Sequence, residues 1–214
     1  MRFRLVARAI VLASIVTPLP ACSGLFESDT PPIQSYILRA TPPQESAGDP
    51  VKGTLRVSHP LAAPGLESER IVLVQSDHRL NYFTGSRWAA NMPEVVEALA
   101  IETLRGSSVW AVVQGSGSAF NSDYTLQISV RRFDADYTEN ANAPVVRVAF
   151  DCVLSRRLDR ELLGSFTAEA AEQSTENRLA AVVEAFEVAT NKALAVVAER
   201  SAESVRTSKA PSSP

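Results

Sequence analysis

The sequence predicts an α+β protein: a single domain with an antiparallel or mixed sheet and helices packed on one face, including a long C-terminal helix. Two patterns lead to this prediction. Apolar and polar residues alternate over 124–131 and again over 146–154, the period of a strand with one solvated face. After residue 174 the apolar period changes to that of an amphipathic helix. Runs of strands followed by helices favour the α+β class.

Strand patterns dominate the first half of the chain. Short apolar runs predict four strands, at 35–39, 53–59, 70–75 and 79–84. A helix is expected to begin near Pro93, because proline suits the first turn of a helix and Glu94 complements the helix dipole there. Gly106 is expected to end this helix.

The second half predicts further strands and the closing helix. Three strands are expected, at 109–114, 124–131 and 146–154, and 162–170 is a candidate edge strand. The last helix has about 25 residues and would be roughly 37 Å long. Its apolar stripe must be buried across the sheet or against a second helix in a coiled coil. We favour the sheet, because the apolar spacing is sustained for too few heptads.

The chain starts with a segment unlike the rest. Residues 1–21 contain three arginines and no acidic residue, followed by an apolar run at 9–16 that is too short to span a bilayer as a helix. We interpret 1–21 as an export signal. The sequence Leu19-Pro20-Ala21-Cys22 resembles the bacterial lipobox, in which the cysteine receives a diacylglycerol before cleavage and an acyl chain such as palmitate afterwards. The alternative is a conventional signal peptide, for which Leu19 is a poor match.

Lipidation would make Cys22 the first residue of the mature protein and its attachment to the membrane. Resemblance to lipoproteins of Gram-negative bacteria implies a sorting role for the next residue. Aspartate at that position tends to retain the protein at the inner membrane, so Ser23 favours the outer membrane, with the body of the protein facing the periplasm.

These features divide the chain into a signal peptide (1–21), a tether (22–34), an α+β domain (35–200) and a disordered tail (201–214). From Cys22 onward there are 18 basic and 24 acidic residues, a net charge of −6, which argues against nucleic acid as a partner. The second cysteine, Cys152, lies in an alternating apolar run. We expect it to be a buried thiol, with a reactive thiol as the alternative.

Common catalytic motifs are missing from the sequence, so we expect no enzyme activity, no metal and no cofactor other than the lipid on Cys22. The glycine-rich run 115–118 indicates a strand connection, with Ser116 as the candidate nucleophile if the protein is a hydrolase. The two histidines, His59 and His78, have no local partner at metal-ligand spacing. Asp134 and Asp136 are expected to solvate a turn.

The segment 60–90 carries a family resemblance. It contains Pro64-Gly65-Leu66, Leu80-Asn81-Tyr82 and Arg87-Trp88-Ala89, and lies between a strand with Tyr36-Ile37-Leu38 and a closing helix with Val183, Ala185 and Phe186. With the lipobox ahead, the chain resembles the ABC-type transport auxiliary lipoproteins, the PqiC-like lipoproteins, over roughly 35–197.

The resemblance implies a docking or scaffolding component of a system that moves lipids between the inner and outer membranes. Its partner would be an MCE-domain protein that acts with an ABC ATPase and permease, and a homo-oligomer would be possible. Tyr82, Arg87 and Trp88 are the possible partner contacts. Packing at the junction of sheet and helix is the alternative for the two aromatic rings. Direct binding of a lipid between helix and sheet is the second functional hypothesis.

Overall fold

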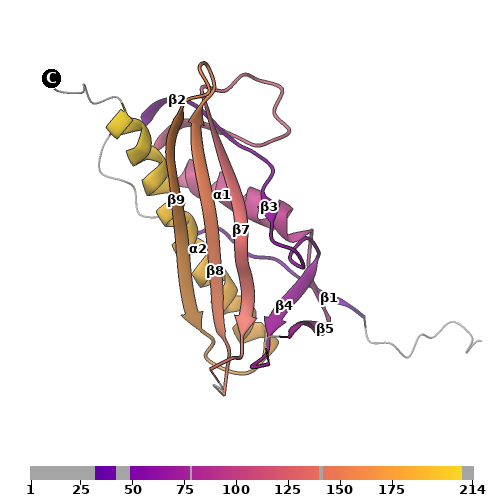
Figure 1. Cartoon of the computed structure of the whole chain (residues 1–214). Helices are drawn as coiled ribbons and strands as arrows, with labels where there is room; N and C mark the ends of the chain where they lie inside the picture. The colour runs from indigo at the N-terminus through magenta and orange to yellow at the C-terminus, as the bar shows by residue number, and fades with distance from the viewer. Residues whose placement is uncertain (1–31, 42–48, 78, 140–141, 209–214) are drawn as a thin grey trace, which may run out of the picture. The chain divides into compact units, whose positions relative to one another are not determined.

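The computed structural model describes residues 32–41, 49–77, 79–139 and 142–208, and these form one α+β domain (Figure 1). The predicted signal peptide, most of the tether, His78 and residues 209–214 lie outside the described residues. The sheet has nine strands. They are β1 (Gln34–Tyr36), β2 (Val51–Val57), β3 (Leu61–Ala62), β4 (Arg70–Val74), β5 (Leu80–Trp88), β6 (Trp110–Gln114), β7 (Tyr124–Asp136), β8 (Val145–Arg156) and β9 (Leu162–Gln173).

The central strand of the sheet is β7, which has neighbours along both edges. One edge pairs with β8 in antiparallel register from Tyr124↔Arg156 to Asp136↔Val145, and β8 pairs in turn with β9. The other edge is shared by three parallel strands in succession, β2, β3 and β4. The sheet therefore forks beside β7, because β6 extends it from β2 while β5 and β1 extend it from β4.

Both helices, α1 (Met92–Gly106) and α2 (Leu179–Ser208), lie behind the sheet in Figure 1. The mixed sheet with helices on one face and a long C-terminal helix confirms the predicted fold class. The strand at 162–170 is also confirmed, as part of β9, which has one neighbour and forms an edge of the sheet. The two-residue β3 was not predicted, since it is too short to show a period.

Three aromatic rings join the layers at the centre of the core. Trp88 of β5 meets Phe133 of β7 and Phe186 of α2 edge-on, with ring centroids 5.9 and 5.2 Å away, and Phe133 lies 5.1 Å from Phe186. All three side chains are fully buried. Edge-to-face pairs of this kind add about 0.5 to 1.5 kcal/mol each beyond the burial of their area.

Cys152 is free and buried among these core residues, as the alternating pattern predicts. Its side chain points to the core face of β8 together with Phe150 and Leu154. Burial raises the pKa of the thiol to about 12, and the negative charge of Asp151 adds to the effect. The thiolate is therefore scarce at neutral pH, which argues against a reactive cysteine.

The domain extends further toward the C-terminus than the sequence analysis placed it. Helix α2 continues to Ser208, so the tail predicted to be disordered from 201 is helical over 201–208. Ser201, Ala202 and Val205 are buried, and the Trp110 indole N–H donates a hydrogen bond of 3.1 Å to the Ser201 hydroxyl. The prediction was wrong because small and polar residues look like a tail in sequence, although α2 brings one face of them against β6.

A chain that ends at Arg200 is therefore expected to be less stable than one that ends at Ser208. The shorter chain loses the burial of Val205 and leaves the Trp110 indole without its acceptor, a loss of roughly 2 to 4 kcal/mol. Urea unfolding followed by tryptophan fluorescence measures the difference. The chain that ends at Ser208 is the control and should match the full chain. Equal midpoints for all three chains would contradict the packing of this last segment.

Candidate functional site

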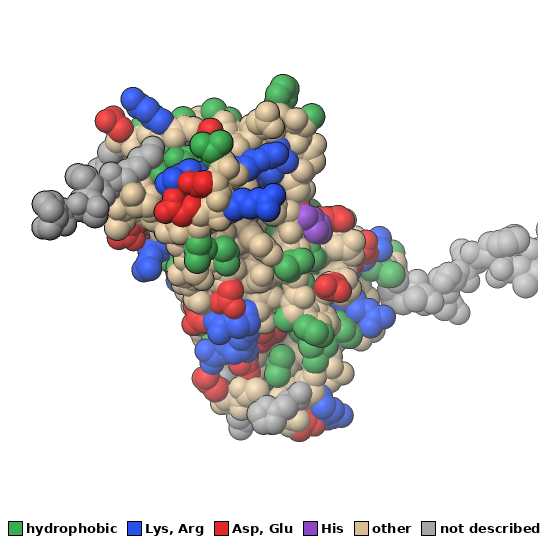
Figure 2. Space-filling view, turned by 45° about the horizontal axis from the view of Figure 1, so that its top comes forward, with side chains coloured by type: hydrophobic (Ala, Val, Ile, Leu, Met, Phe, Trp, Pro, Cys, Tyr) green, Lys and Arg blue, Asp and Glu red, His purple; other side chains and the backbone are tan. Residues whose placement is uncertain are grey.

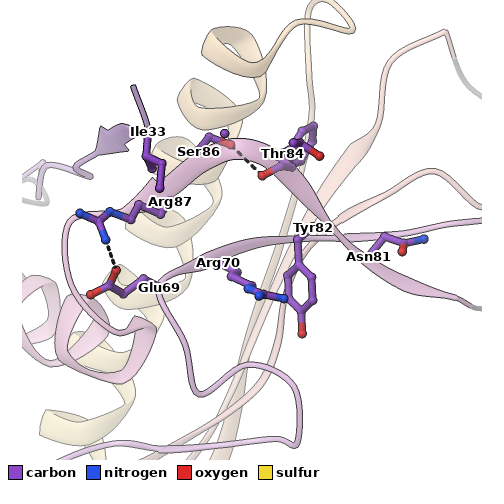
Figure 3. Close-up of a pocket in the computed structure, with 10 residues that line it drawn as sticks. Ile33, Glu69, Arg70, Asn81, Tyr82, Thr84, Ser86 and Arg87 are labelled. Carbon is purple, nitrogen blue, oxygen red and sulfur yellow. Dashed lines mark hydrogen bonds and ion pairs between the residues drawn. The ribbon is translucent and has the colours of Figure 1, made fainter. Parts of the chain in front are cut away.

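A groove of about 550 Å³ lies at the edge of the lower branch of the sheet, over β4 and β5 (Figure 3). Its lining comes from the start of β4, from β5 and from Ile33, just ahead of β1. The lining residues are Ile33, Glu69, Arg70, Asn81, Tyr82, Phe83, Thr84, Gly85, Ser86 and Arg87. Two of the three predicted contact residues, Tyr82 and Arg87, therefore lie at one surface site.

An irregularity in strand pairing shapes this groove. Arg70 pairs with Arg87 and Val72 with Tyr82, so a single residue of β4 lies opposite the four residues 83–86 of β5. Gly85 has a φ of 69°, a left-handed conformation that glycine adopts without strain. The Ser86 hydroxyl closes the bulge by donating to the Phe83 carbonyl at 3.0 Å. A bulge changes the direction of the side chains beside it. Here the bulge in β5 opens the edge of the strand.

Two cations in the groove are held in different ways. The Arg70 guanidinium lies over the Tyr82 ring, 4.7 Å from its centroid, and has no ion pair among the described residues. Arg87 donates to Glu69 at 2.9 Å and to the Ser35 hydroxyl at 3.2 Å. Figure 3 shows these groups along the same strand edge. The result is a preformed, half-exposed surface with an aromatic ring, two guanidinium groups and one carboxylate.

Trp88 does not belong to this surface. Its side chain is 1% exposed and packs against Phe133 and Phe186, so it cannot meet a partner in the folded protein. The reason is the alternation of a strand, which sends Arg87 and Trp88 to opposite faces of β5. Of the two roles considered for this residue, core packing is the one observed, and the contact role is wrong.

The lipidation residue Cys22 and the sorting residue Ser23 lie outside the described residues, so their roles stay predictions. Ile33 is the groove residue nearest to Cys22 and Ser23 in the sequence. Ten peptide units separate Cys22 from Pro32, which limits their distance to roughly 35 Å. A lipid on Cys22 would hold the groove within that distance of the bilayer.

The candidate nucleophile Ser116 lies near a histidine and a carboxylate, but not as a catalytic triad. The Ser116 backbone N–H donates to Glu97 at 2.8 Å, and His59 Nδ1 contacts the other Glu97 oxygen at 3.0 Å. Burial raises the pKa of Glu97, but hydrogen bonds from Ser116 and His59 outweigh it and hold the pKa below its ordinary value. Within the described residues, no hydrogen bond joins the Ser116 hydroxyl to His59, as it would in a Ser-His-acid triad.

The open face of the sheet carries a cluster of ionic side chains. Asp136 accepts hydrogen bonds from Arg132 at 3.0 Å, Arg147 at 2.9 Å and the Thr138 N–H at 2.8 Å, and Asp134 accepts from Arg132 at 2.7 Å. Both aspartates are buried, so the expectation that they solvate a turn is wrong. The bulge between Val130 and Arg132 turns this stretch so that arginines cover the carboxylates.

The described part of the chain holds no group of three histidine, cysteine or acidic residues placed to bind a metal ion. No helix within the same residues has the length and hydropathy needed to cross a membrane. The interior between α2 and the sheet is filled by the apolar cluster around Phe186, Leu194 and Val197. That packing gives no support to a lipid cavity between helix and sheet.

The groove over β4 and β5 is open to solvent and is lined by both charged and apolar side chains. The model of one family, the ABC-type transport auxiliary lipoprotein component, matches residues 36–200. The chain belongs to this family, as its resemblance suggested. No curated protein matches the chain.

Solved structures show the same fold. The chain is similar to protein XCC0632 from Xanthomonas campestris, with 25% identity and a TM-score of 0.76, over 82% of this chain and 98% of that one. A protein described as uncharacterized is 16% identical, with a TM-score of 0.64 over 79% and 99% of the two chains. Protein CT253 from Chlamydia trachomatis is 9% identical, with a TM-score of 0.54 over 73% and 99%.

Sequence reasoning found Tyr82 and Arg87 but missed how the groove forms. Gly85 inside a strand pattern is the signal that could have indicated the bulge. Glu69, the partner of Arg87, lies in the loop before β4, and no local spacing connects the two.

The buried Asp136 predicts a pH dependence of stability. Burial raises its pKa, but hydrogen bonds from Thr138, Arg132 and Arg147 outweigh this and hold it well below the ordinary value of 3.8. Its stabilising contribution is therefore complete above about pH 4 and is lost as the pH falls further. Asp136→Asn should cost about 1 to 3 kcal/mol at pH 7, and the difference from wild type should shrink below pH 4. Urea unfolding at several pH values measures this.

Asp77→Asn is the matched control, since Asp77 is exposed and pairs only with its neighbour Arg79 in the described residues. It should leave the unfolding midpoint unchanged at pH 7. A constant difference between wild type and Asp136→Asn from pH 7 to pH 3 would show that the charge of Asp136 is not what stabilises the cluster.

Proposed function

We propose that this protein is the outer-membrane-anchored, periplasm-facing auxiliary lipoprotein of an ABC/MCE-type system for intermembrane lipid transport. In this proposal it acts as a docking or scaffolding component, and the lipid on Cys22 holds it to the membrane. The observation that carries the proposal is the family match over residues 36–200, which spans nearly the whole described domain. The lipobox at 19–22 supports the anchor, and Ser23 supports the choice of membrane.

The groove over β4 and β5 is the contact surface that we assign to the partner, an MCE-domain protein. Tyr82 offers a ring that is already stacked under Arg70, so little side-chain entropy is lost when a partner covers it. Tyrosine and arginine are also the residues most enriched at the energetic centres of protein interfaces. Assembly of several identical subunits around one partner is part of the same proposal, and mass photometry of the purified complex would measure it.

Site-specific cross-linking tests the docking role. A photo-reactive amino acid in place of Tyr82 should form a covalent adduct with the MCE-domain protein in intact cells, and Arg87→Glu in the same chain should reduce the adduct several-fold. The adduct is identified by mass spectrometry. Val188 is the control position, because it is exposed on α2 and does not line the groove. Adducts of equal yield from both positions, or none from Tyr82, would count against docking through this groove.

Lipidation predicts a second outcome. Cys22→Ala should leave an uncleaved precursor that does not incorporate labelled palmitate, because the thiol that receives the lipid is gone. Gel mobility and palmitate labelling measure this. Ser23→Asp should leave processing intact and shift the mature protein to the inner membrane fraction in a density gradient. A Cys22→Ala protein that is cleaved normally and stays in the membrane fraction would remove the basis of the anchor.

A further inference from the structure

An unusual surface lies at the end of the sheet where β7 begins. The loop 115–123 between β6 and β7 and the turn 157–161 between β8 and β9 meet there, because Tyr124 pairs with Arg156. We call these two segments, with Lys52 and Leu162, the tip. Leu158 is 93% exposed, Phe120 79% and Leu162 60%. Figure 2 shows hydrophobic side chains together with basic and acidic side chains at this upper end of the domain.

The tip is hollowed as well as apolar. A groove of about 680 Å³ runs between the start of β2, the loop 115–123 and the turn 157–161. Lys52, Ser122, Arg157 and Leu158 are among its lining residues. Ser122 itself is only 8% exposed.

The charged side chains of the tip differ in their partners. Asp159 and Glu161 both pair with Arg156, whereas Asp123, which lines the groove, accepts the Thr54 N–H at 2.7 Å and keeps its negative charge. Lys52, Arg157 and Arg160 have no ion pair among the described residues. Two of these three, Lys52 and Arg157, line the groove, where Asp123 is the one acidic lining residue. Such a surface attracts a carboxylate.

The tip is also held in place before any partner arrives. The Arg157 N–H donates to the Asp123 carbonyl at 2.8 Å and joins the turn to the loop, and the Arg156 N–H donates to the Glu161 carbonyl at 2.8 Å. The Asp123 carboxylate holds the middle of β2 through the Thr54 N–H. A surface that is already ordered loses little entropy on binding, which favours a specific contact.

The position of the tip relative to the predicted anchor favours a protein over the bilayer as its occupant. β1 joins the sheet through β5 and β4, and β4 pairs with β7 only at Ala135 and Asp136, toward the end opposite the tip (Figure 1). The 13 residues of β7 span roughly 40 Å. The segment from Cys22 to Pro32 reaches at most about 35 Å. Even fully stretched, this segment is shorter than β7, which disfavours contact of the tip with the bilayer.

We propose that the tip is a second docking surface, and that it binds a segment of the partner protein in which a carboxylate lies beside an apolar side chain. Lys52 and Arg157 meet the carboxylate. Leu158 and Phe120 cover the apolar side chain. This inference rests on the proposed function, since the partner is the MCE-domain protein, and it adds a contact on the side of the domain away from the anchor.

The test compares two Arg-Leu pairs, each at a turn between neighbouring strands. The tip variant is Arg157→Glu with Leu158→Ser, and the matched control is Arg79→Glu with Leu80→Ser in the connection between β4 and β5. The mature lipidated protein in detergent micelles is titrated with the periplasmic part of the MCE-domain protein from the same genome. We expect the tip variant to bind about tenfold more weakly or worse and the control to bind like wild type. Amide exchange of 115–123 and 157–162 should slow in the wild-type complex.

Three other results are possible, and each contradicts a different part of the proposal. If wild type binds and the tip variant binds equally well, the tip is not a docking surface, while the proposed function stands. If wild type does not bind, the proposed function fails and the tip loses its partner. If exchange at the tip slows in nanodiscs with phosphatidylglycerol but not in phosphatidylcholine alone, without the MCE-domain protein, the tip binds an anionic lipid surface instead.

Discussion

The contact of Trp88 with Phe133 and Phe186 is the interaction on which the domain depends most. These rings come from β5, β7 and α2, which are far apart in the sequence and meet in one buried cluster. The short parallel pairing of β4 with β7 could not hold the lower branch of the sheet alone, since it joins only two residue pairs. Burial of a tryptophan there fixes β5, and with it the bulge and the groove beside Arg87.

The forked sheet explains why the exposed features gather at two places. The β7 strand is long enough to carry one branch at each end, β2 and β6 near Tyr124 and β4, β5 and β1 near Asp136. Loops that leave neighbouring strands at one end of a sheet necessarily lie together. One end therefore collects the turns that form the tip, and the other branch exposes the edge that forms the groove. Both helices cover one face of the sheet and leave the groove and the tip exposed.

The sequence alone predicted the strands and helices in which apolar residues recur at a regular period. Alternation in β7 and β8 and the helical stripe of α2 gave the class and the order of the elements, because burial of one face imposes those periods. It was insufficient where a contact depends on residues distant in the chain. The hydrogen bond from Trp110 to Ser201 and the ion pairs of Asp136 with Arg147 come from tertiary neighbours. Tyr82 and Arg87 were predicted for the site, but strict alternation would have placed Tyr82 on the face of Trp88 and Arg87 on the other face. The bulge at residues 83–86, which brings Tyr82 and Arg87 to one surface, was not predicted.

The groove and the tip together fit a protein that binds to other proteins better than they fit a protein that works without partners. The groove over β4 and β5 lies beside the point where the chain arrives from Cys22, and the tip lies toward the far end of a strand roughly 40 Å long. Both are ordered by hydrogen bonds within the domain, and both combine guanidinium groups with apolar or aromatic side chains. A rigid body with such surfaces at separated positions can hold one partner at two points, as the proposed docking role requires.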